Sequence, residues 1–292
     1  MTECYLCPRL CGARREAGEY GFCGQSADIN ISRADLHMFE EPVISGKRGS
    51  GTIFFSGCSL RCVFCQNRAI SRATSNKGMT LTPRELADIM LSLEEKGAHN
   101  INLVTATHFA DKIAEALLLV KDKLSIPVIY NSSGYERVKT LRMLCGLVDI
   151  YMPDIKYASC ELAERYSSAP DYPQVAVAAI KEMVRQTGAP IFDTDGMLKK
   201  GTLVRHLVLP AHREDSIEVM RMLAAAVTPD MILLSLMSQY TPEFALDSPH
   251  KNLHRRLTTF EYDSVLEVAQ ALGFEGFSQK RDSASSVYTP DF

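Results

Sequence analysis

The sequence predicts an α/β fold: an open barrel of six β/α units with a small metal-binding segment ahead of it. From about residue 50 onward, apolar runs typical of strands alternate with segments of helical periodicity, which is the pattern of a parallel sheet with crossover helices. Six such units are too few for a closed barrel of eight strands. Four cysteines precede them, in a stretch with almost no apolar periodicity to build a core. We therefore expect a cysteine-rich segment over residues 1–30 and the partial barrel over residues 31–292.

The expected strands are short apolar runs, at Thr52–Phe55, Asn100–Thr105, Ile126–Tyr130, Val148–Met152, Val204–Leu209 and Met231–Met237. The expected helices fall between and after them, at 83–97, 110–123, 135–144, 172–186, 215–226 and 259–273. Capping boxes that begin at Thr82 and Thr258 mark the starts of the first and last helices. Asp195-Gly196 suits a tight turn, so a small hairpin is expected over residues 192–198. The serine-rich tail after Gln279 is expected to wrap irregularly or to be mobile.

The bulk composition excludes several classes of protein. The chain has 292 residues, of which 46% are apolar and 23% charged, as in an ordinary soluble protein. A net charge of −3 gives no electrostatic footprint for nucleic acid or for an anionic membrane. No apolar run reaches transmembrane length, and the polar, cysteine-bearing N-terminus does not have the pattern of a signal peptide. The nine cysteines favour a reducing cytoplasm over a disulfide framework.

Three cysteines lie close together directly after the first expected strand. Cys58, Cys62 and Cys65 have the spacing C-x3-C-x2-C, with Phe64 just before the last cysteine. Three thiolates from one loop can hold three irons of a [4Fe–4S] cluster and leave the fourth iron open to a small molecule. The alternatives are a zinc site that takes a fourth ligand from elsewhere, or three cysteines of the core. The apolar strand that leads in and the position of the aromatic residue favour the cluster.

A second set of cysteines lies ahead of the first strand, at Cys4, Cys7, Cys11 and Cys23. Four thiolates in so short a segment, with glycines and a proline for tight turns, can ligate one metal centre completely. Tetrahedral zinc and a closed [4Fe–4S] cluster both suit this spacing, so the metal stays open. Cys145 and Cys160 have no motif around them and are expected to pack as small apolar residues.

Polar side chains follow every later strand at the point where it ends. Because chemistry in parallel α/β barrels takes place at the carboxyl ends of the strands, we expect one cavity there. The candidates are Thr105, Thr107, His108, Asn131, Ser133, Asp154, Lys156, His212, Gln239 and Tyr240. Plainer readings exist for several of them. His108 can be a histidine at a helix start, Asp154 and Lys156 a solvated ion pair, and Gln239 and Tyr240 parts of a turn.

Two neighbours on the fifth strand are read differently. His206 is expected to be a core histidine, whereas Arg205 faces the opposite way and can bind a carboxylate.

The three-cysteine loop resembles that of the radical S-adenosylmethionine (SAM) superfamily, whose cores are partial (β/α)6 barrels. Further motifs are similar to the branch of the pyruvate formate-lyase activating enzymes: Cys-Gln-Asn, Thr-x-Thr-His-Phe, Pro-Asp-Ile-Lys, Leu-Val-Leu-Pro and Gln-Tyr-x-Pro. The resemblance implies that the open iron binds SAM and that reduction cleaves it to a 5′-deoxyadenosyl radical. It also implies SAM contacts from Asp154 and Lys156, from Asn131 or Ser133, and from His212 on the adenosyl side.

One departure from that branch concerns the turn after the second strand. Activating enzymes carry a Gly-Gly-Glu-type turn that takes the amino group of SAM, whereas this chain has Thr105-Ala106-Thr107-His108. Threonine hydroxyls and backbone carbonyls can accept a hydrogen bond from an ammonium group, so Thr105 and Thr107 are candidates for the same contact. His108 is a candidate SAM contact or proton donor.

The resemblance leaves three functional hypotheses. The first is an enzyme that cleaves SAM and takes hydrogen from a glycine of a glycyl-radical enzyme, with a one-electron donor such as flavodoxin or ferredoxin. The second is a radical SAM enzyme that acts on a small molecule or peptide. The third is a non-catalytic iron–sulfur or zinc module for electron transfer; the open-iron loop and the polar strand ends argue against it.

Overall fold

The computed structural model describes residues 3–72 and 78–279. Within them, ten strands form one sheet in the order β10-β9-β8-β6-β5-β4-β2-β1-β3, with β7 paired to β8 outside this path. Seven strands run parallel: β2 (Ser50–Phe55), β4 (Ile101–Val104), β5 (Val128–Ser132), β6 (Ile150–Pro153), β8 (Leu198–Leu207), β9 (Leu233–Met237) and β10 (Gly276–Ser278). The six expected strands are present in sequence order, and β3 and β10 form two unjoined edges, so the open α/β barrel is confirmed.

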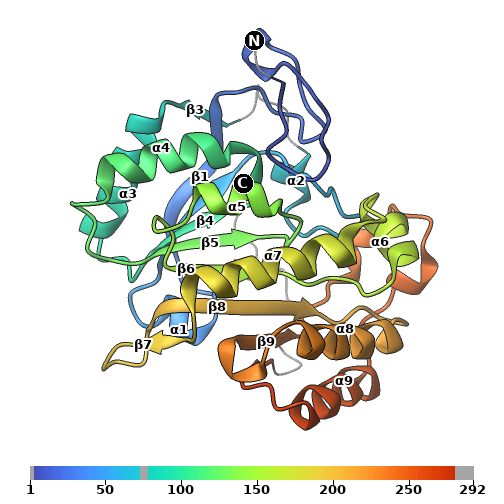
Figure 1. The fold of residues 1–292 in the computed structure, drawn as a ribbon. Coiled ribbons are helices and arrows are strands. Elements are labelled where there is room, and N and C mark those ends of the chain that lie inside the picture. Colours follow the sequence, from blue (N-terminus) through green and yellow to red (C-terminus); the bar gives the residue numbers. More distant parts are fainter. Residues whose placement is uncertain (1–2, 73–77, 280–292) are drawn as a thin grey trace.

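The helices cover the outer face of the sheet (Figure 1). The six expected ones are α3 (Pro83–Glu95), α4 (Ala110–Val120), α5 (Val138–Met143), α7 (Tyr172–Thr187), α8 (Arg213–Ala226) and α9 (Thr259–Ala271). Three shorter ones were not expected: α1 (Pro42–Ser45), α2 (Arg68–Ser71) and α6 (Cys160–Ser167). Single 3-10 turns lie at Arg15–Ala17, Thr107–Phe109, Pro229–Met231, Pro242–Ala245 and Lys251–Leu253. No helix among the described residues is long and apolar enough to cross a membrane.

Local sequence signals account for several of these boundaries. Both capping boxes form: Thr82 caps α3 and Thr258 caps α9, each exchanging hydrogen bonds with the glutamate three residues on. The expected hairpin also forms, between β7 (Ile191–Phe192) and β8, with Gly196 at φ 76° in the turn. Helix α5 begins three residues after its expected start at Tyr135, because residues 134–136 form a turn in which the Glu136 N–H bonds to the carbonyl of Gly134.

Two antiparallel strands at one edge were not expected. Strand β1 (Ile29–His37) pairs with β2 on one side and with β3 (Met79–Leu81) on the other. The sheet therefore begins inside the last residues of the cysteine-rich segment expected over 1–30. Ahead of it, residues 3–28, called here the N-terminal segment, form loops around the single 3-10 turn and lie beside α2 (Figure 1).

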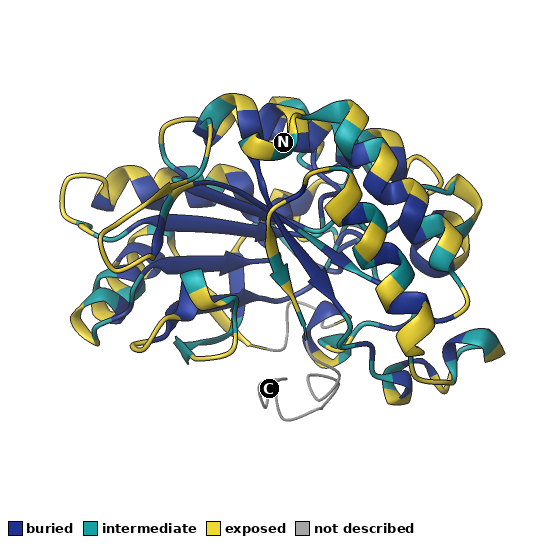
Figure 2. Ribbon diagram, turned by 90° about the horizontal axis from the view of Figure 1, so that it is seen from below, coloured by how far each residue is buried: buried dark blue, intermediate teal, exposed yellow. Residues whose placement is uncertain are grey.

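The core lies on both sides of the parallel strands. Figure 2 shows the strands buried along their length, with exposed residues mostly on the outward faces of the helices. One large apolar cluster joins β2, β4 and β5 to helices α3 and α4, and a second joins β8 and β9 to α8 and α9. Cys145 and Cys160 belong to neither cluster: both are exposed, so the expectation that they pack as core residues is wrong. They lie at helix ends, where their side chains face solvent. The tail after Gln279 lies outside the described residues.

Candidate functional site

A cavity opens at the carboxyl ends of the parallel strands. Strand register brings these ends level, since Phe54 of β2 pairs with Val104 of β4, and Val104 pairs with Asn131 of β5. The residues that line the cavity come from the ends of all the central strands and from the loop that follows β2. The position is the one expected from the polar strand ends.

Residues 57–70, called here the cysteine loop, form one wall of the cavity. The loop is closed at its stem, because the Gly57 N–H donates to the carbonyl of Ile70 at 2.8 Å. Gly57 has φ 83°, and a Cβ built on it would lie 2.5 Å from the carbonyl oxygen of Cys23, so the N-terminal segment packs directly on the stem. Only glycine fits both conditions.

The three cysteines of this loop all line the cavity: Cys58, Cys62 and Cys65. Burial raises the pKa of the Cys58 thiol, and the neighbouring Cys62 raises it further. Burial and the same neighbour raise the pKa of Cys65 to about 12. Among the described residues, no three His, Cys, Asp or Glu side chains are arranged to enclose a single metal ion. Three thiols spread along one cavity wall fit a cluster that takes one thiolate per iron.

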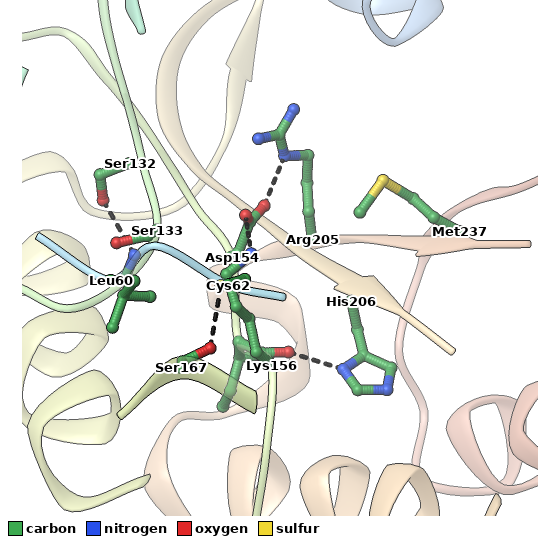
Figure 3. A network of polar contacts seen from close by, with 12 residues as sticks. Leu60, Cys62, Ser132, Ser133, Asp154, Lys156, Ser167, Arg205, His206 and Met237 are labelled. Carbon is green, nitrogen blue, oxygen red and sulfur yellow. Dashed lines mark hydrogen bonds and ion pairs between the residues drawn. The ribbon is translucent and has the colours of Figure 1, made fainter. Parts of the chain in front are cut away.

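Four partly buried ionic groups, called here the ion network, lie at the cavity floor: Asp154, Lys156 and Arg205 line it, and Glu40 contacts Arg205 from outside the lining. Lys156 Nζ lies 2.6 Å from one carboxylate oxygen of Asp154, and Arg205 Nε lies 3.0 Å from the other (Figure 3). Backbone pairing between Asp154 and Arg205 places them side by side. Although burial opposes ionisation, the two cations hold the pKa of Asp154 below its usual range. The Asp154 carboxylate is therefore partly buried and bridges Lys156 and Arg205. The alternative interpretation of Asp154 and Lys156 as a solvated ion pair is wrong.

Arg205 joins two further groups to this network. Its guanidinium donates to Asn131 Oδ1 at 2.8 Å and lies 3.5 Å from the carboxylate of Glu40. Burial raises the pKa of Glu40, which also accepts a hydrogen bond from Asn102 at 3.0 Å. The sequence indicated a carboxylate partner for Arg205 but gave no signal for Glu40, which lies between β1 and α1 and far from every strand end that was considered. His206 points the other way, as expected, with Nδ1 at 2.6 Å from the carbonyl of Ile155.

Thr105 lies on the cavity wall in a strained conformation. Its φ is 62°, in the left-handed region that β-branched residues rarely adopt. Its N–H nevertheless bonds to the carbonyl of Asn131 at 2.9 Å, so the strand pairing continues up to this residue. Strain of this kind persists only where the surrounding structure enforces it, and it is concentrated at functional sites.

Three of the candidates do not lie on the cavity. The Thr107 hydroxyl donates to the buried carboxylate of Glu136, and His108 Nε2 lies 2.8 Å from the carbonyl of Ser56. Burial lowers the pKa of His108 to about 3, so this ring is neutral. His212 Nε2 is 2.8 Å from the hydroxyl of Tyr166. The left-handed turn at Thr105 directs the residues that follow it away from the strand end, which is why Thr107 and His108 are buried behind the cavity.

The remaining candidates line the cavity: Asn131, Ser133, Gln239 and Tyr240. Gln239 accepts a hydrogen bond from Gln279 at 3.2 Å, and Tyr240 donates to the carbonyl of Leu253 at 2.7 Å while its ring packs on Phe64. Tyr240 therefore fixes the aromatic residue of the cysteine loop as well as shaping the turn after β9.

The four cysteines of the N-terminal segment lie close to one another behind the cysteine loop. Burial raises the pKa of Cys7 to about 12, and Cys23 and Cys4 add to this shift. Cys11 and Cys23 both approach Gly21, at 3.1 and 3.6 Å from a Cβ built there. Three of the four are thus at least partly withdrawn from solvent, and Cys11 is exposed.

The protein is an open parallel barrel, and thiols and a bridged carboxylate line the cavity at its strand ends. These features are typical of barrel enzymes that hold a cofactor at the strand ends. The Radical SAM superfamily domain matches residues 52–223, which include β2 from Thr52 onward, the cysteine loop and strands β3 to β8. The chain belongs to the Radical SAM superfamily. The superfamily's cofactors are a [4Fe–4S] cluster and SAM, so the chain is a radical SAM enzyme by membership.

Other proteins are similar to this chain in sequence or in fold. An uncharacterized protein of Methanocaldococcus jannaschii is 31% identical over 281 residues, which cover 92% of this chain and 75% of that protein. A radical SAM methyltransferase from Sphaerobacter thermophilus has a similar fold, with a TM-score of 0.54 and 15% identity over 81% of this chain and 69% of that one. SuiB of Streptococcus suis, bound to the precursor peptide SuiA, has a TM-score of 0.50 and 12% identity over 76% of this chain and 46% of its own. At these identities the two structures bear on the fold alone.

Proposed function

We propose that Cys58, Cys62 and Cys65 hold one [4Fe–4S] cluster, and that the protein uses it to cleave SAM reductively and to abstract hydrogen from a substrate. The observation that carries the proposal is that the three thiols and three members of the ion network, Asp154, Lys156 and Arg205, line the same cavity. When bound, the cluster supplies the electron that cleaves SAM to methionine and a 5′-deoxyadenosyl radical.

The chain's own residues bind and orient SAM. The Asp154 carboxylate is ionised and fixed between two cations, so it accepts hydrogen bonds from hydroxyl or ammonium groups of SAM without having to be deprotonated. Lys156 and Arg205 present positive charge to the methionine carboxylate. Asn131, Ser133 and Thr105, at the ends of the neighbouring strands, offer neutral oxygens to the same cavity. His212 stays a candidate for the adenosyl side, held by Tyr166 outside the cavity lining.

The test is the yield of 5′-deoxyadenosine from anaerobically reconstituted, dithionite-reduced protein. We expect the parent chain to produce it, and Cys58→Ala, Cys62→Ala and Cys65→Ala each to abolish it with loss of about four irons per chain. Cys145→Ala and Cys160→Ala are matched controls, because both thiols are exposed and distant from the cavity. Full cleavage by the triple alanine protein would contradict the proposal.

The finer proposal is that the hydrogen comes from a glycine of a partner, a glycyl-radical enzyme, with flavodoxin or ferredoxin as the electron donor. Motifs that follow the strands support it, with Asp154 and Lys156 as the most specific match. A glycyl-radical signal in electron paramagnetic resonance (EPR) spectra of a candidate partner, after incubation with the reduced protein and SAM, would identify this activity. Cleavage of SAM with no such signal on any partner tried would favour a small molecule or peptide as substrate.

We also propose that Cys4, Cys7, Cys11 and Cys23 hold a second, closed centre, either zinc or [4Fe–4S]. The support is the short spacing of the four cysteines along the chain, the mutual influence of their thiols, and their position behind the stem of the cysteine loop. As they stand, these thiols, all of them among the described residues, do not enclose a single metal ion, so binding would draw them together. With all ligands supplied by the protein, this centre has no open position for SAM.

A further inference from the structure

The end of helix α6 is tied to the cysteine loop beside Cys62. The Ser167 hydroxyl donates a hydrogen bond to Cys62 Sγ at 2.9 Å (Figure 3), and the Val63 N–H donates to the carbonyl of Tyr166 at 2.9 Å. Ser167 is 1% exposed, so water does not compete for this contact. Such a hydroxyl donor on the sulfur of a prospective metal ligand was not suggested by any motif in the sequence.

A second hydroxyl contacts Ser167. Tyr157 Oη lies 2.8 Å from Ser167 Oγ, and Tyr157 is fully buried. A sulfur that ligates iron carries no proton, so with the proposed cluster bound Ser167 donates to Cys62 and its oxygen accepts from Tyr157. Hydrogen bonds in such a chain polarise one another, which strengthens the contact to sulfur.

Arg9 of the N-terminal segment contacts the backbone of Ser167. The guanidinium of Arg9 donates to the carbonyl of Ser167 at 2.8 Å, to that of Ser168, and to that of Ser59 in the cysteine loop at 2.7 Å. Arg9 lies between Cys7 and Cys11, and its guanidinium also stacks 4.0 Å from the ring centre of Phe22. One side chain thus locks the end of α6 and the cysteine loop together.

We propose that the Ser167 hydroxyl sets the reduction potential of the cluster bound through Cys62, and that Arg9 positions it. The inference rests on the cluster of the proposed function. A hydrogen bond to a ligating sulfur withdraws electron density from it, which stabilises the reduced cluster and raises its potential. The step concerned is the gain of one electron from a low-potential donor by the oxidised cluster, with no bond made or broken in the protein.

The test is an EPR-monitored redox titration of reconstituted protein without SAM. We expect Ser167→Ala to shift the midpoint to more negative potential, with about tenfold less reduced cluster at a fixed potential, equivalent to ~59 mV for one electron. Ser167→Thr, which keeps the hydroxyl, restores the parent value. Tyr157→Phe gives a smaller shift in the same direction. Ser168→Ala, at the exposed neighbouring position, leaves the potential unchanged.

Arg9→Lys separates position from charge, because lysine keeps the positive charge but cannot span three carbonyl groups. A negative shift in Arg9→Lys supports the positioning role, and a parent-like potential overturns it. The role of Ser167 is overturned if Ser167→Ala binds a full cluster at the parent potential, or if Ser168→Ala shifts it equally. If the parent chain assembles no [4Fe–4S] cluster, it is the proposed function that fails.

Discussion

Lys156 Nζ lies 2.6 Å from the carboxylate of Asp154, on the floor of a cavity that three thiols also line. The two residues are only two positions apart and follow the last residue of β6. They are held there by Tyr172, whose hydroxyl lies 2.8 Å from the carbonyl of Ser133 and 3.0 Å from that of Asp154, and accepts from the N–H of Lys156 at 3.0 Å. Tyr172 is the first residue of helix α7, so this helix fixes the position of Asp154 and Lys156, which follow β6.

Replacing either partner should weaken SAM binding. Loss of one hydrogen bond to a charged group costs about 1.5–3 kcal/mol, so Asp154→Asn and Lys156→Gln should each lower SAM affinity by about 10- to 150-fold. Calorimetry on reconstituted protein measures this. Lys181→Gln, an exposed lysine on α7, is the control. Parent-like affinity in both cavity variants would mean that the residue assignment is wrong even though the superfamily is right.

Thr105→Gly should make the fold more stable and SAM binding weaker. A non-glycine residue in the left-handed region costs about 1–2 kcal/mol, and Thr105 has φ 62°, so glycine should raise the free energy of unfolding by about 1 kcal/mol. The same substitution removes a hydroxyl from the cavity wall and should lower SAM affinity. Ser168→Gly is the matched control, since Ser168 has φ 51° but lies outside the cavity. Unchanged affinity in Thr105→Gly would exclude Thr105 as a SAM contact.

Glu136 should make stability depend on pH. Burial raises its pKa from 4.5 to about 8, against the opposing hydrogen bond from Thr107. Between these values the folded chain binds more protons than the unfolded chain, so stability falls as pH rises, by at most ~1.4 kcal/mol per pH unit. Denaturant unfolding at pH 5.5 and 7.5 measures the loss. Glu136→Gln should reduce it, and an equal loss in the parent and the variant would contradict the assignment.

Metal analysis should identify the centre of the N-terminal segment. Roughly eight irons per chain indicate two cubane clusters, whereas roughly four irons with one zinc indicate a structural zinc site. Substituting Cys4, Cys7, Cys11 and Cys23 by serine should remove only the second centre. About four irons and no other metal, in protein purified without chelator, would leave these four residues as ordinary thiols.

The sequence was sufficient for the parallel part of the fold, because apolar runs and helical periodicity are local signals. It also located Cys58, Cys62, Cys65, Asp154 and Lys156 at the cavity, since each follows directly from a strand end or a loop spacing. Strand β1 was missed because a register shift between Ile31 and Arg33 changes the phase of its apolar and polar alternation, and because its pairing with β2 is antiparallel in an otherwise parallel pattern.

Other parts of the site depend on long-range geometry that no spacing reveals. Glu40 reaches Arg205 from 165 positions away, and Ser167 reaches Cys62 from 105 positions away. Thr107 and His108 were assigned to the cavity because they follow β4, but a single left-handed residue before them changes the chain's direction. The backbone angle of a threonine cannot be read from its identity.

The cysteine loop leaves and rejoins the fold at one point, where the Gly57 N–H meets the carbonyl of Ile70 at 2.8 Å. A segment whose ends meet in this way can change in length without altering the path of β2, provided that it keeps its cysteines and its contacts to Arg9, Tyr166 and Ser167. A transplanted loop that keeps these contacts should therefore be accepted at this position. Because the N-terminal segment packs on the stem at Cys23, a transplanted loop must keep glycine at position 57.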